Sequence, residues 1–460
     1  MPSTPLTLFD KLWNDHQVAS IPGGGLILID RILLHERTGG IALQSLADSG
    51  RAVAAPAQVF ATMDHVVDTL PGRTDRTIMP TGTDFIRATR EQAHAAGITL
   101  FDIGDPGQGI VHVISPEQAI VLPGVTLVCP DSHTCSQGAL GALAWGIGST
   151  EAEHALATRT LRVARPRTMR VTVSGRLAPG VTAKDLALHI LARHGSGGAK
   201  GHVVEYAGEA VRALDVEARL TLCNMATEFS AFTAIIAPDE TVFDYLKGRA
   251  YAPQGAAWEA AVAYWRTLRS DDDAVFDAEI AVDATEVAPM ISWGTSPQDA
   301  VPIDGRVPAT AAARPLEYMG LSPDLPLLGL PIDAAFIGSC TNSRLSDLRR
   351  AAALLEGRRV APGVKAICVP GSTAVKQAAE AEGLDRVFKA AGFEWRESGC
   401  SMCFFSGGES FGTRQRVVTS TNRNFESRQG PETRSHLASP ETVAASAIAG
   451  RIADPRTLGC

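Results

Sequence analysis

The stretch AAFIGSCTNSR, residues 334–344, contains the pattern that decides the fold. Its first four residues are apolar and typical of a short buried strand, and the small and polar residues after them are suited to open a helix. A short apolar run that ends in a polar turn recurs in four other stretches: GVTLVCPDSH (124–133), RTMRVTVSG (167–175), VKAICVPGS (364–372) and RVVTSTNRNF (416–425). The chain therefore offers several short buried strands, each followed by a loop that can carry polar groups.

Segments with helical periodicity lie between these strands. They are STEAEHALATRTL (149–161), TAKDLALHILARHG (182–195), SRLSDLRRAAALLEG (343–357) and STAVKQAAEAEGLDRVFKAAG (372–392). Alternation of buried strands with helices predicts an α/β fold with mainly parallel sheets. In such sheets ligands bind beyond the carboxyl ends of the strands, so we expect the polar loops to form the functional site.

The chain of 460 residues is long enough for several domains. A boundary is predicted near residues 164–173, where a helix gives way to a new strand, and the Pro- and Ala-rich stretch 304–329 is interpreted as a linker. These positions divide the chain into residues 1–165, 166–303 and 330–460, each predicted to be an α/β domain.

Composition and charge exclude several classes of protein. Hydrophobic residues make up 45% of the chain and charged residues 20%, the net charge is −8 and the isoelectric point is about 5.8. The chain has no basic block and no apolar run of membrane length, so we expect no nucleic-acid and no membrane partner. The N-terminus does not resemble a secretory signal, and it predicts an amphipathic helix that Thr7 caps, with Leu8, Phe9, Leu12 and Trp13 on one face. We expect a cytoplasmic protein whose clustered cysteines bind metal or take part in catalysis.

Three of the eight cysteines stand in polar loops after predicted strands. They are Cys340 in GSCTNSR and the pair Cys400 and Cys403 in GCSMC. A C-x-x-C pair alone is also consistent with a structural zinc half-site or with two buried thiols. Three cysteines, however, suit a 4Fe-4S cluster in which one iron has no cysteine ligand. An open coordination position is what Lewis-acid chemistry needs, so this set favours catalysis over electron transfer.

The alternative of a zinc site requires a fourth ligand close to the three cysteines. Cys368 lies inside the apolar run KAIC and is interpreted as a core thiol, and no histidine occurs between residues 340 and 403. Asn342 and Ser343 follow Cys340 directly, and we expect them to supply hydrogen-bond donors near its thiolate.

Polar residues elsewhere in the chain form a set suited to acid–base chemistry on an anionic substrate. The set contains Asp64, His65, His112, Asp131, Ser132, His133, Asn224, Glu228, Asn422, Arg423 and Arg428. Each has an ordinary structural explanation: Asp64 and His65 suit a surface turn, and His112 suits an apolar strand of the core. Taken together, carboxylates can orient imidazoles and tune their basicity, and arginines can bind carboxylates through two parallel hydrogen bonds. With iron, this set would suit dehydration of a hydroxy-polycarboxylate.

The motifs ATMDH, GQGIVHV, DSHT, GHVVEY, LCNMATE, GSCTNSR, GCSMC and NRNFESRQG occur here in the order in which they occur in the aconitase superfamily. The chain resembles this family from TLFDKLW to ASPETVAASAIAGRIAD, which is nearly its whole length. The resemblance implies three α/β domains around a 4Fe-4S cluster that Cys340, Cys400 and Cys403 ligate. It also implies three carboxylate–imidazole pairs, Asp64 with His65, Asp131 with His112 and Glu228 with His133. Ser132, Arg423 and Arg428 would then contact the substrate, and Asn224 and Asn422 would support the cluster or the substrate.

The family also has a fourth, swivelling domain, which carries a serine general base. The chain ends at Cys460, too soon after Cys403 for such a domain. The resemblance therefore implies a separate small subunit that carries the fourth domain and the base. The closest branch of the family isomerises isopropylmalate in leucine biosynthesis by dehydration and rehydration, and we expect that reaction here.

The sequence departs from the family pattern in one place that bears on the substrate. Where the family has a substrate-contacting glutamine, the stretch TGGIALQSL places Ile41. An apolar residue there would favour a related hydro-lyase that acts on citramalate, homocitrate or citrate. A regulator that carries a cluster without turnover is a further alternative, but the complete acid–base set and the acidic isoelectric point argue against it.

Overall fold

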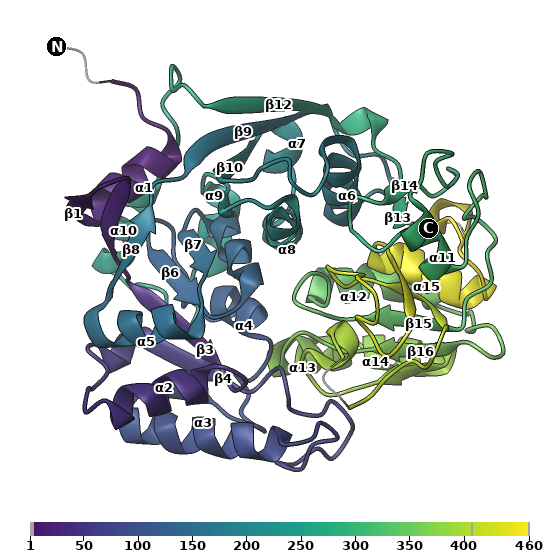
Figure 1. Ribbon diagram of the computed structural model, residues 1–460, viewed down its shortest axis with the longest axis horizontal. Coiled ribbons are helices and arrows are strands. Elements are labelled where there is room, and N and C mark those ends of the chain that lie inside the picture. The colour runs from purple at the N-terminus through teal and green to yellow at the C-terminus, as the bar shows by residue number, and fades with distance from the viewer. Residues whose placement is uncertain (1–3, 406–407, 459–460) are drawn as a thin grey trace.

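Three parallel β-sheets form the framework of the molecule, as the sequence predicts. The computed structural model describes residues 4–405 and 408–458 (Figure 1), so the outermost residues of the first and third predicted domains lie outside it. The sheets fall within residues 31–146, 167–283 and 334–437, and two small antiparallel sheets accompany them. This arrangement confirms the predicted α/β class with mainly parallel sheets.

The first sheet has five parallel strands in the order β5-β4-β3-β6-β7. Their bounds are β3 (Arg31–His35), β4 (Val59–Thr62), β5 (Thr99–Phe101), β6 (Thr126–Cys129) and β7 (Leu143–Gly146). The helices that belong to it are α2 (Gly39–Asp48), α3 (Gly82–Ala96), α4 (Val111–Glu117) and α5 (Ser149–Thr158). Strand β3 lies in the centre of the sheet, and every strand residue from Ile32 to His35 is buried, so the residues that follow β3 begin deep in the molecule.

The second sheet has four parallel strands in the order β11-β10-β9-β12. These are β9 (Arg167–Ser174), β10 (His202–Ala207), β11 (Thr233–Ile235) and β12 (Ala278–Asp283). Helices α6 (Ala183–His194) and α8 (Val216–Asn224) pack against each other beside it. Helix α8 also packs along the 3-10 helix Ser132–Leu140 that follows β6, and this contact joins the second sheet to the first.

The third sheet has five parallel strands in the order β17-β16-β15-β18-β19. They are β15 (Ala334–Ile337), β16 (Lys365–Cys368), β17 (Phe393–Trp395), β18 (Arg416–Thr419) and β19 (Arg434–Leu437). Its helices are α12 (Leu345–Leu355), α13 (Thr373–Ala381), α14 (Leu384–Ala391) and α15 (Pro440–Ala449). Figure 1 shows this sheet to one side of the molecule, with α4 of the first sheet and α8 of the second facing it.

The expected local elements form with small differences at their ends. Helix α1 (Leu8–His16) begins at the Thr7 cap, and Leu8, Phe9, Leu12 and Trp13 are its buried residues, as predicted. The long helical stretch 372–392 is divided into α13 and α14, because Gly383 between them adopts a left-handed conformation with φ of +78°.

Two details of the sequence interpretation differ from the structure. His112 lies on helix α4 and not in an apolar strand; the β-branched run around it favoured a strand, but Gly109 and Ile110 bind the third sheet's loop at Gly371 and Ser372, where α4 then begins. The stretch 304–329 contains helix α11 (Ala313–Met319) and packs buried apolar side chains against the core of the third sheet. The domain limits themselves stay a prediction. Across the residues that the structure describes, no helix combines the length and apolarity that a membrane crossing requires.

Candidate active site and metal centre

Two parallel sheets direct the carboxyl ends of their strands at one cavity. Loops after β3, β4 and β6 reach it from the first sheet, and loops after β15, β17 and β18 reach it from the third. The cavity has a volume of about 160 Å³. Its lining consists of Arg37, His65, Ile110, His112, Asp131, Ser132, His133, Ser339, Cys340, Cys400, Cys403, Phe404, Asn422, Arg423 and Arg428. Parallel strands place their carboxyl ends on one edge, and this geometry explains how loops distant in sequence meet here.

His65 lies between two carboxylates at the cavity wall. Its Nδ1–H group donates to Oδ1 of Asp64 at 2.5 Å, and its Nε2 lies 3.2 Å from Oδ2 of Asp131. Burial alone would lower the pKa of His65, but the charges and hydrogen bonds of Asp64 and Asp131 outweigh it and raise the pKa well above 6.5. At neutral pH the ring is therefore a positively charged imidazolium at the cavity wall.

Asp131 is the centre of a second set of contacts. Its Oδ1 accepts hydrogen bonds from Nε2 of His112 at 3.0 Å and from the backbone N–H of His133 at 2.7 Å. Burial would raise the pKa of Asp131, but hydrogen bonds from His112, His133 and His65 outweigh burial and hold the pKa well below 3.8. Asp131 is therefore an ionised carboxylate at neutral pH, and it contacts three histidines, His65, His112 and His133.

The third carboxylate–imidazole pair joins the first and second sheets. Nε2 of His133 donates to Oε1 of Glu228 at 2.9 Å, and Nε of Arg423 donates to the same oxygen at 2.8 Å. Burial would raise the pKa of Glu228, but His133 and then Arg423 outweigh burial and lower it. All three predicted pairs thus lie within hydrogen-bond distance.

The three cysteines come from two loops of the third sheet. Cys340 follows β15, whereas Cys400 and Cys403 follow β17, and all three are buried and line the cavity. Ser339 and Ser401, which stand beside these cysteines, adopt left-handed conformations with φ of +81° and +47°. Such conformations are costly for a residue with a side chain and are concentrated at functional sites, so the loops favour a ligand over simple packing.

Two side-chain amides surround the Cys340 sulfur. Nδ2 of Asn224 lies 3.2 Å from Sγ of Cys340, and Nδ2 of Asn422 lies 3.4 Å from it. The prediction that Asn342 and Ser343 supply hydrogen-bond donors near this sulfur is wrong. Nδ2 of Asn342 donates to Thr221 and Asp347, and Oγ of Ser343 donates to the carbonyl of Ser339, because both residues lie in the turn that opens α12.

The chemistry of these donors fits an iron–sulfur cluster. Burial raises the pKa of the Cys340 thiol to about 11 although the Asn224 amide lowers it, so this sulfur is a thiol at neutral pH unless a metal stabilises its charge. The hydrogen bond from Cys400 lowers the pKa of Cys403 to about 7. Thiolates are the ligands of such clusters, and N–H groups directed at sulfur tune their potential. Three cysteine sulfurs thus share one cavity, and two amides lie within hydrogen-bond distance of one of them, Cys340; this donor set suits the cluster ligands that the sequence predicts.

Arg37 also lines the cavity, and the sequence interpretation missed it. Its guanidinium lies 4.9 Å from the centre of the Phe404 ring, and that of Arg428 lies 5.6 Å from the same ring. The signal was present, because Glu36 and Arg37 follow the buried strand β3 much as Asp64 and His65 follow β4. Ile41, by contrast, lies on α2 with an exposed fraction of 54% and is not among the residues that line the cavity.

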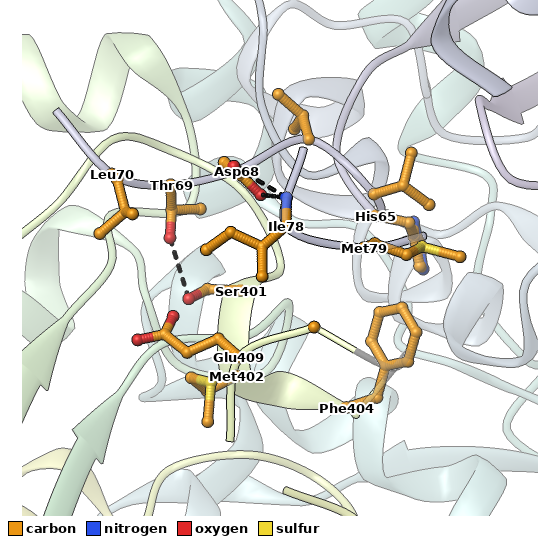
Figure 2. Close-up of a pocket in the computed structure, with 13 residues that line it drawn as sticks. His65, Asp68, Thr69, Leu70, Ile78, Met79, Ser401, Met402, Phe404 and Glu409 are labelled. Atoms are coloured by element: carbon orange, nitrogen blue, oxygen red, sulfur yellow. Dashed lines mark hydrogen bonds between the residues drawn. The ribbon is translucent and has the colours of Figure 1, made fainter. Parts of the chain in front are cut away.

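The loop after β4 wraps around the C-x-x-C loop. A smaller cavity of about 50 Å³ lies between them, and the Thr69 hydroxyl donates a hydrogen bond of 2.9 Å to Ser401. Figure 2 shows the side chains that line this cavity. The backbone N–H of Ile78 donates to the carboxylate of Asp68 at 3.0 Å and closes the far end of the loop. His65 and Phe404 border both cavities, so the loop after β4 and the C-x-x-C loop contribute to both.

Comparison with known proteins places this site in a family. The Aconitase family (aconitate hydratase) matches residues 10–450. A relative from Bradyrhizobium diazoefficiens, the 3-isopropylmalate dehydratase large subunit 1, is 52% identical over 463 residues that cover 98% of this chain and 97% of the relative. The 3-isopropylmalate dehydratase large subunit of Roseiflexus castenholzii is 50% identical over 469 residues, with 98% and 99% covered. Together with the three sheets around the cysteine-lined cavity, this similarity establishes that the chain belongs to the aconitase family.

Proposed function

We propose that this chain is the large subunit of a 3-isopropylmalate dehydratase. The reaction interconverts 2- and 3-isopropylmalate by removing water and adding it back at the neighbouring carbon, through the unsaturated diacid 2-isopropylmaleate. The observation that carries the proposal is one cavity lined by three cysteines, three arginines and three imidazoles, each imidazole held by a carboxylate. The names of two relatives about half identical over nearly the whole chain support the same reaction.

The arginines suit the two carboxylates of the substrate. The Arg423 guanidinium donates to Glu228 through Nε. Its two terminal amino groups have no hydrogen-bond partner among the described residues, so both can bind an anion. Arg428 and Arg37 also line the cavity, and both guanidinium groups lie near the Phe404 ring. A planar guanidinium binds a carboxylate through two parallel bonds and fixes its orientation. Ser132, Asn224 and Asn422 are proposed to complete the substrate and cluster contacts.

His65 is the proposed donor of the proton that leaves with the hydroxyl group. Asp64 binds Nδ1, so the proton on Nε2 is the one that faces Asp131 and the cavity. A protonated acid at this place converts hydroxide, a poor leaving group, into water. In the return direction the same ring accepts a proton from the water that adds.

The other two carboxylate–imidazole pairs fix side chains elsewhere around the cavity. Asp131 fixes His112, and Glu228 fixes His133 and Arg423. These bonds set the tautomers of both rings, because a carboxylate at Nε2 requires the proton on that nitrogen. Cys340, Cys400 and Cys403 would hold a 4Fe-4S cluster, which when bound supplies an iron that is open to the substrate's oxygen atoms and acts as a Lewis acid.

The base that removes the carbon-bound proton is proposed to come from a separate small subunit. The described residues that line the cavity include three imidazoles and two serines, Ser132 and Ser339, and Oγ of Ser132 lies 3.4 Å from Nδ1 of the neighbouring His133. The relatives are named large subunits, and this supports a partner for the present chain. A reducing, cytoplasmic location remains part of the proposal, since thiolates and iron clusters persist there.

Replacing Arg423 with lysine is expected to raise KM about 10- to 100-fold. A lysine carries one charge but cannot form two parallel bonds to a carboxylate, and each charge-assisted bond contributes about 1.5–3 kcal/mol. The change also leaves Oε1 of Glu228 without its second donor. Steady-state kinetics on 3-isopropylmalate with the complete two-subunit enzyme measure the effect.

The matched control is Arg414→Lys. Arg414 pairs with Glu432 on the surface and its side chain is 71% exposed, so both kinetic constants should stay at the wild-type values. An unchanged KM and kcat in Arg423→Lys would remove Arg423 from the substrate site.

The function itself is tested with a panel of substrates. The reconstituted large–small complex is assayed without oxygen on 2- and 3-isopropylmalate, citramalate, homocitrate and citrate. We expect a clear preference for isopropylmalate. Preference for another diacid would retain the mechanism but assign the protein to a different hydro-lyase, and absence of turnover on every member would contradict the proposal.

A further inference from the structure

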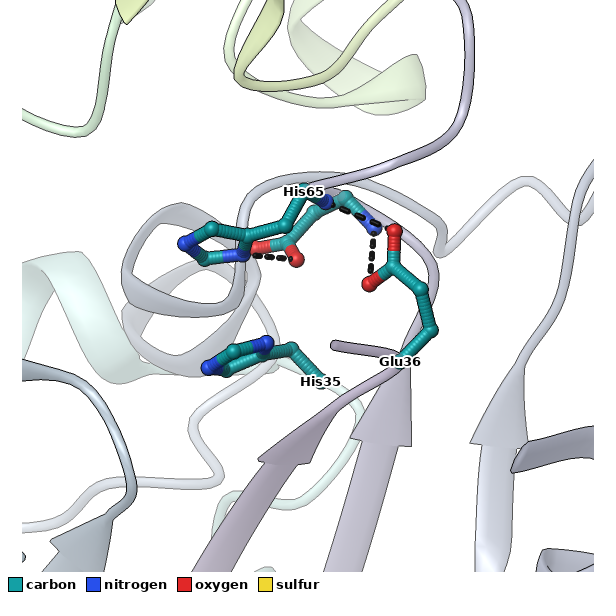
Figure 3. A group of neighbouring side chains, drawn as sticks. His35, Glu36 and His65 are labelled. Atoms are coloured by element: carbon teal, nitrogen blue, oxygen red, sulfur yellow. Dashed lines mark hydrogen bonds and ion pairs between the residues drawn. The ribbon is translucent and has the colours of Figure 1, made fainter. Parts of the chain in front are cut away.

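His35 and Glu36 lie behind the proposed catalytic pair and are not part of the cavity lining. His35 is the last residue of strand β3 and Glu36 follows it directly, and both are buried, with exposed fractions of 2% and 0%. Figure 3 shows the His35 ring beside the His65 ring and the Glu36 carboxylate directed at the backbone that carries His65. One atom of each that could bind a metal, a ring nitrogen or a carboxylate oxygen, lies within 4.8 Å of the others in the set His35, Glu36, Asp64 and His65. Neither residue has a place in the mechanism proposed above.

The carboxylate of Glu36 accepts hydrogen bonds from four consecutive backbone N–H groups. Oε2 accepts from Asp64 at 3.0 Å, and Oε1 accepts from His65, Val66 and Val67 at 2.8, 2.6 and 3.3 Å. Successive N–H groups that converge on one anion form a nest, and they can stabilise a buried carboxylate without a counter-ion. One side chain therefore fixes the backbone of the whole turn that follows β4.

The same turn holds the metal-binding loop. The backbone carbonyl of Asp64 accepts from the N–H of Cys400 at 2.8 Å. Further along, the carbonyl of Thr69 accepts from the N–H of Glu397 at 2.8 Å, and the Thr69 hydroxyl donates to Ser401. A change in the turn at residues 64–67 would therefore displace Cys400 together with His65.

The imidazole of His35 lies against the face of the His65 ring, whose two nitrogens contact Asp64 and Asp131. The two rings are stacked, with centroids 4.0 Å apart and planes at 24°. Nε2 of His35 lies 3.2 Å from the carbonyl of Pro130, so this nitrogen carries the proton and donates it. Within the described residues Nδ1 has no partner, and burial with the charge of His65 lowers the pKa of His35 to about 4. His35 is thus an uncharged imidazole stacked on the protonated ring of His65.

A metal ion held by these four residues is the main alternative. Their oxygen atoms are already occupied: both oxygens of Glu36 accept backbone N–H groups, and the two oxygens of Asp64 accept from His65 and from the N–H of Val111 at 2.8 Å. A metal would have to displace these bonds, so the contacts favour a structural clamp.

We propose that Glu36 and His35 are positioning residues, which together set the catalytic geometry of His65 and the position of the Cys400 loop. Glu36 acts through the backbone of residues 64–67, and His35 acts through the plane of the His65 ring. The inference rests on the function proposed above for His65. It extends that function to two residues that the substrate does not contact.

The variant Glu36→Gln tests the clamp with nearly the same side-chain shape. A glutamine amide has one oxygen and one NH2 group, so at least one backbone N–H would face a donor in place of an acceptor. Small displacements of catalytic groups cost up to about 100-fold in rate. We expect kcat of the two-subunit enzyme to fall about 100-fold with KM within about twofold of the wild type, because the arginines are not moved.

Amide hydrogen exchange of the large subunit alone is the second readout. Loss of a buried hydrogen bond contributes about 1 kcal/mol, so a peptide that contains residues 64–67 should exchange about five- to tenfold faster in Glu36→Gln. This measurement needs no substrate. If the wild-type complex proves inactive on isopropylmalate, the proposed function fails while the exchange experiment still decides whether the clamp exists.

Glu205→Gln is the matched control. Glu205 is buried on β10 with an exposed fraction of 7%, accepts from Oγ of Ser270, and does not line the cavity. It should lose stability without a change in kcat or in exchange at 64–67. Equal effects of the two variants on kcat, or unchanged exchange in Glu36→Gln, would overturn the clamp.

The ring of His35 is tested by two substitutions that do not depend on how Glu36→Gln folds. His35→Phe keeps a flat ring against His65 and should retain most of the wild-type kcat. His35→Ala removes the ring and should lower kcat at least tenfold with KM unchanged. Equal activity of the two variants would show that stacking on His65 is not required, and would overturn the role of His35.

Discussion

Replacing Cys403 with serine is expected to remove the bound iron and the activity together. The sulfur lines the cavity, and the hydrogen bond from Cys400 lowers the pKa of its thiol to about 7, closest to neutral of the three thiols. A serine hydroxyl does not ionise at neutral pH, so Cys340 and Cys400 alone would remain to hold the cluster. We expect activity at background level. Iron and acid-labile sulfide, measured after reconstitution without oxygen, should fall in the same preparation.

Cys368→Ser is the matched control for this experiment. Cys368 ends strand β16, is fully buried, and burial raises its pKa well above the usual value. A serine there places a hydroxyl in an apolar core, which costs stability but leaves the cavity unchanged. Full iron in Cys403→Ser with loss of iron in Cys368→Ser would show that the ligand set is wrong. Zinc in stoichiometric amount without sulfide would exclude a cluster altogether.

The sequence predicted those parts of the fold and site that follow from local patterns. Short apolar runs that end in polar loops are determined by neighbouring residues, so β6, β9, β15, β16 and β18 lie where they were expected. The position of functional groups after these strands follows from the same rule. Local patterns alone did not predict which carboxylate pairs with which imidazole. That prediction came from the resemblance of an ordered set of motifs to a known family.

The remaining features depend on contacts between distant segments. The amides next to Cys340 come from Asn224 and Asn422, about a hundred residues away on either side, and the two neighbours in sequence, Asn342 and Ser343, turn elsewhere. His112 lies on a helix because Gly109 and Ile110 bind the third sheet's loop, a contact that no local pattern reveals. Tertiary packing overrides local preference at such positions.

Replacing His65 with glutamine is expected to lower kcat about 10²- to 10⁴-fold, the usual contribution of a general acid. Glutamine can donate a hydrogen bond to Asp64 but has no proton to release. The cysteines and arginines stay in place, so iron content and KM should remain near the wild-type values. His202→Gln is the matched control: His202 is buried on β10, its Nδ1 contacts the carbonyl of Lys200 at 3.0 Å, and it does not line the cavity.

The pH dependence separates loss of an acid from loss of a structural ring. Activity requires protonated His65, and Asp64 and Asp131 raise the pKa of that ring, so wild-type kcat should persist through neutral pH and fall as pH rises through the raised value. Asp64→Asn removes the charge bonded to Nδ1 and lowers the pKa of His65. The alkaline fall of kcat should then begin at lower pH, while activity on the acid side is retained. If kcat of Asp64→Asn fell equally at every pH and its alkaline limb did not shift, His65 would not be the acid. Asp64 would then serve to support the Cys400 loop, because its backbone carbonyl accepts a hydrogen bond from the Cys400 N–H.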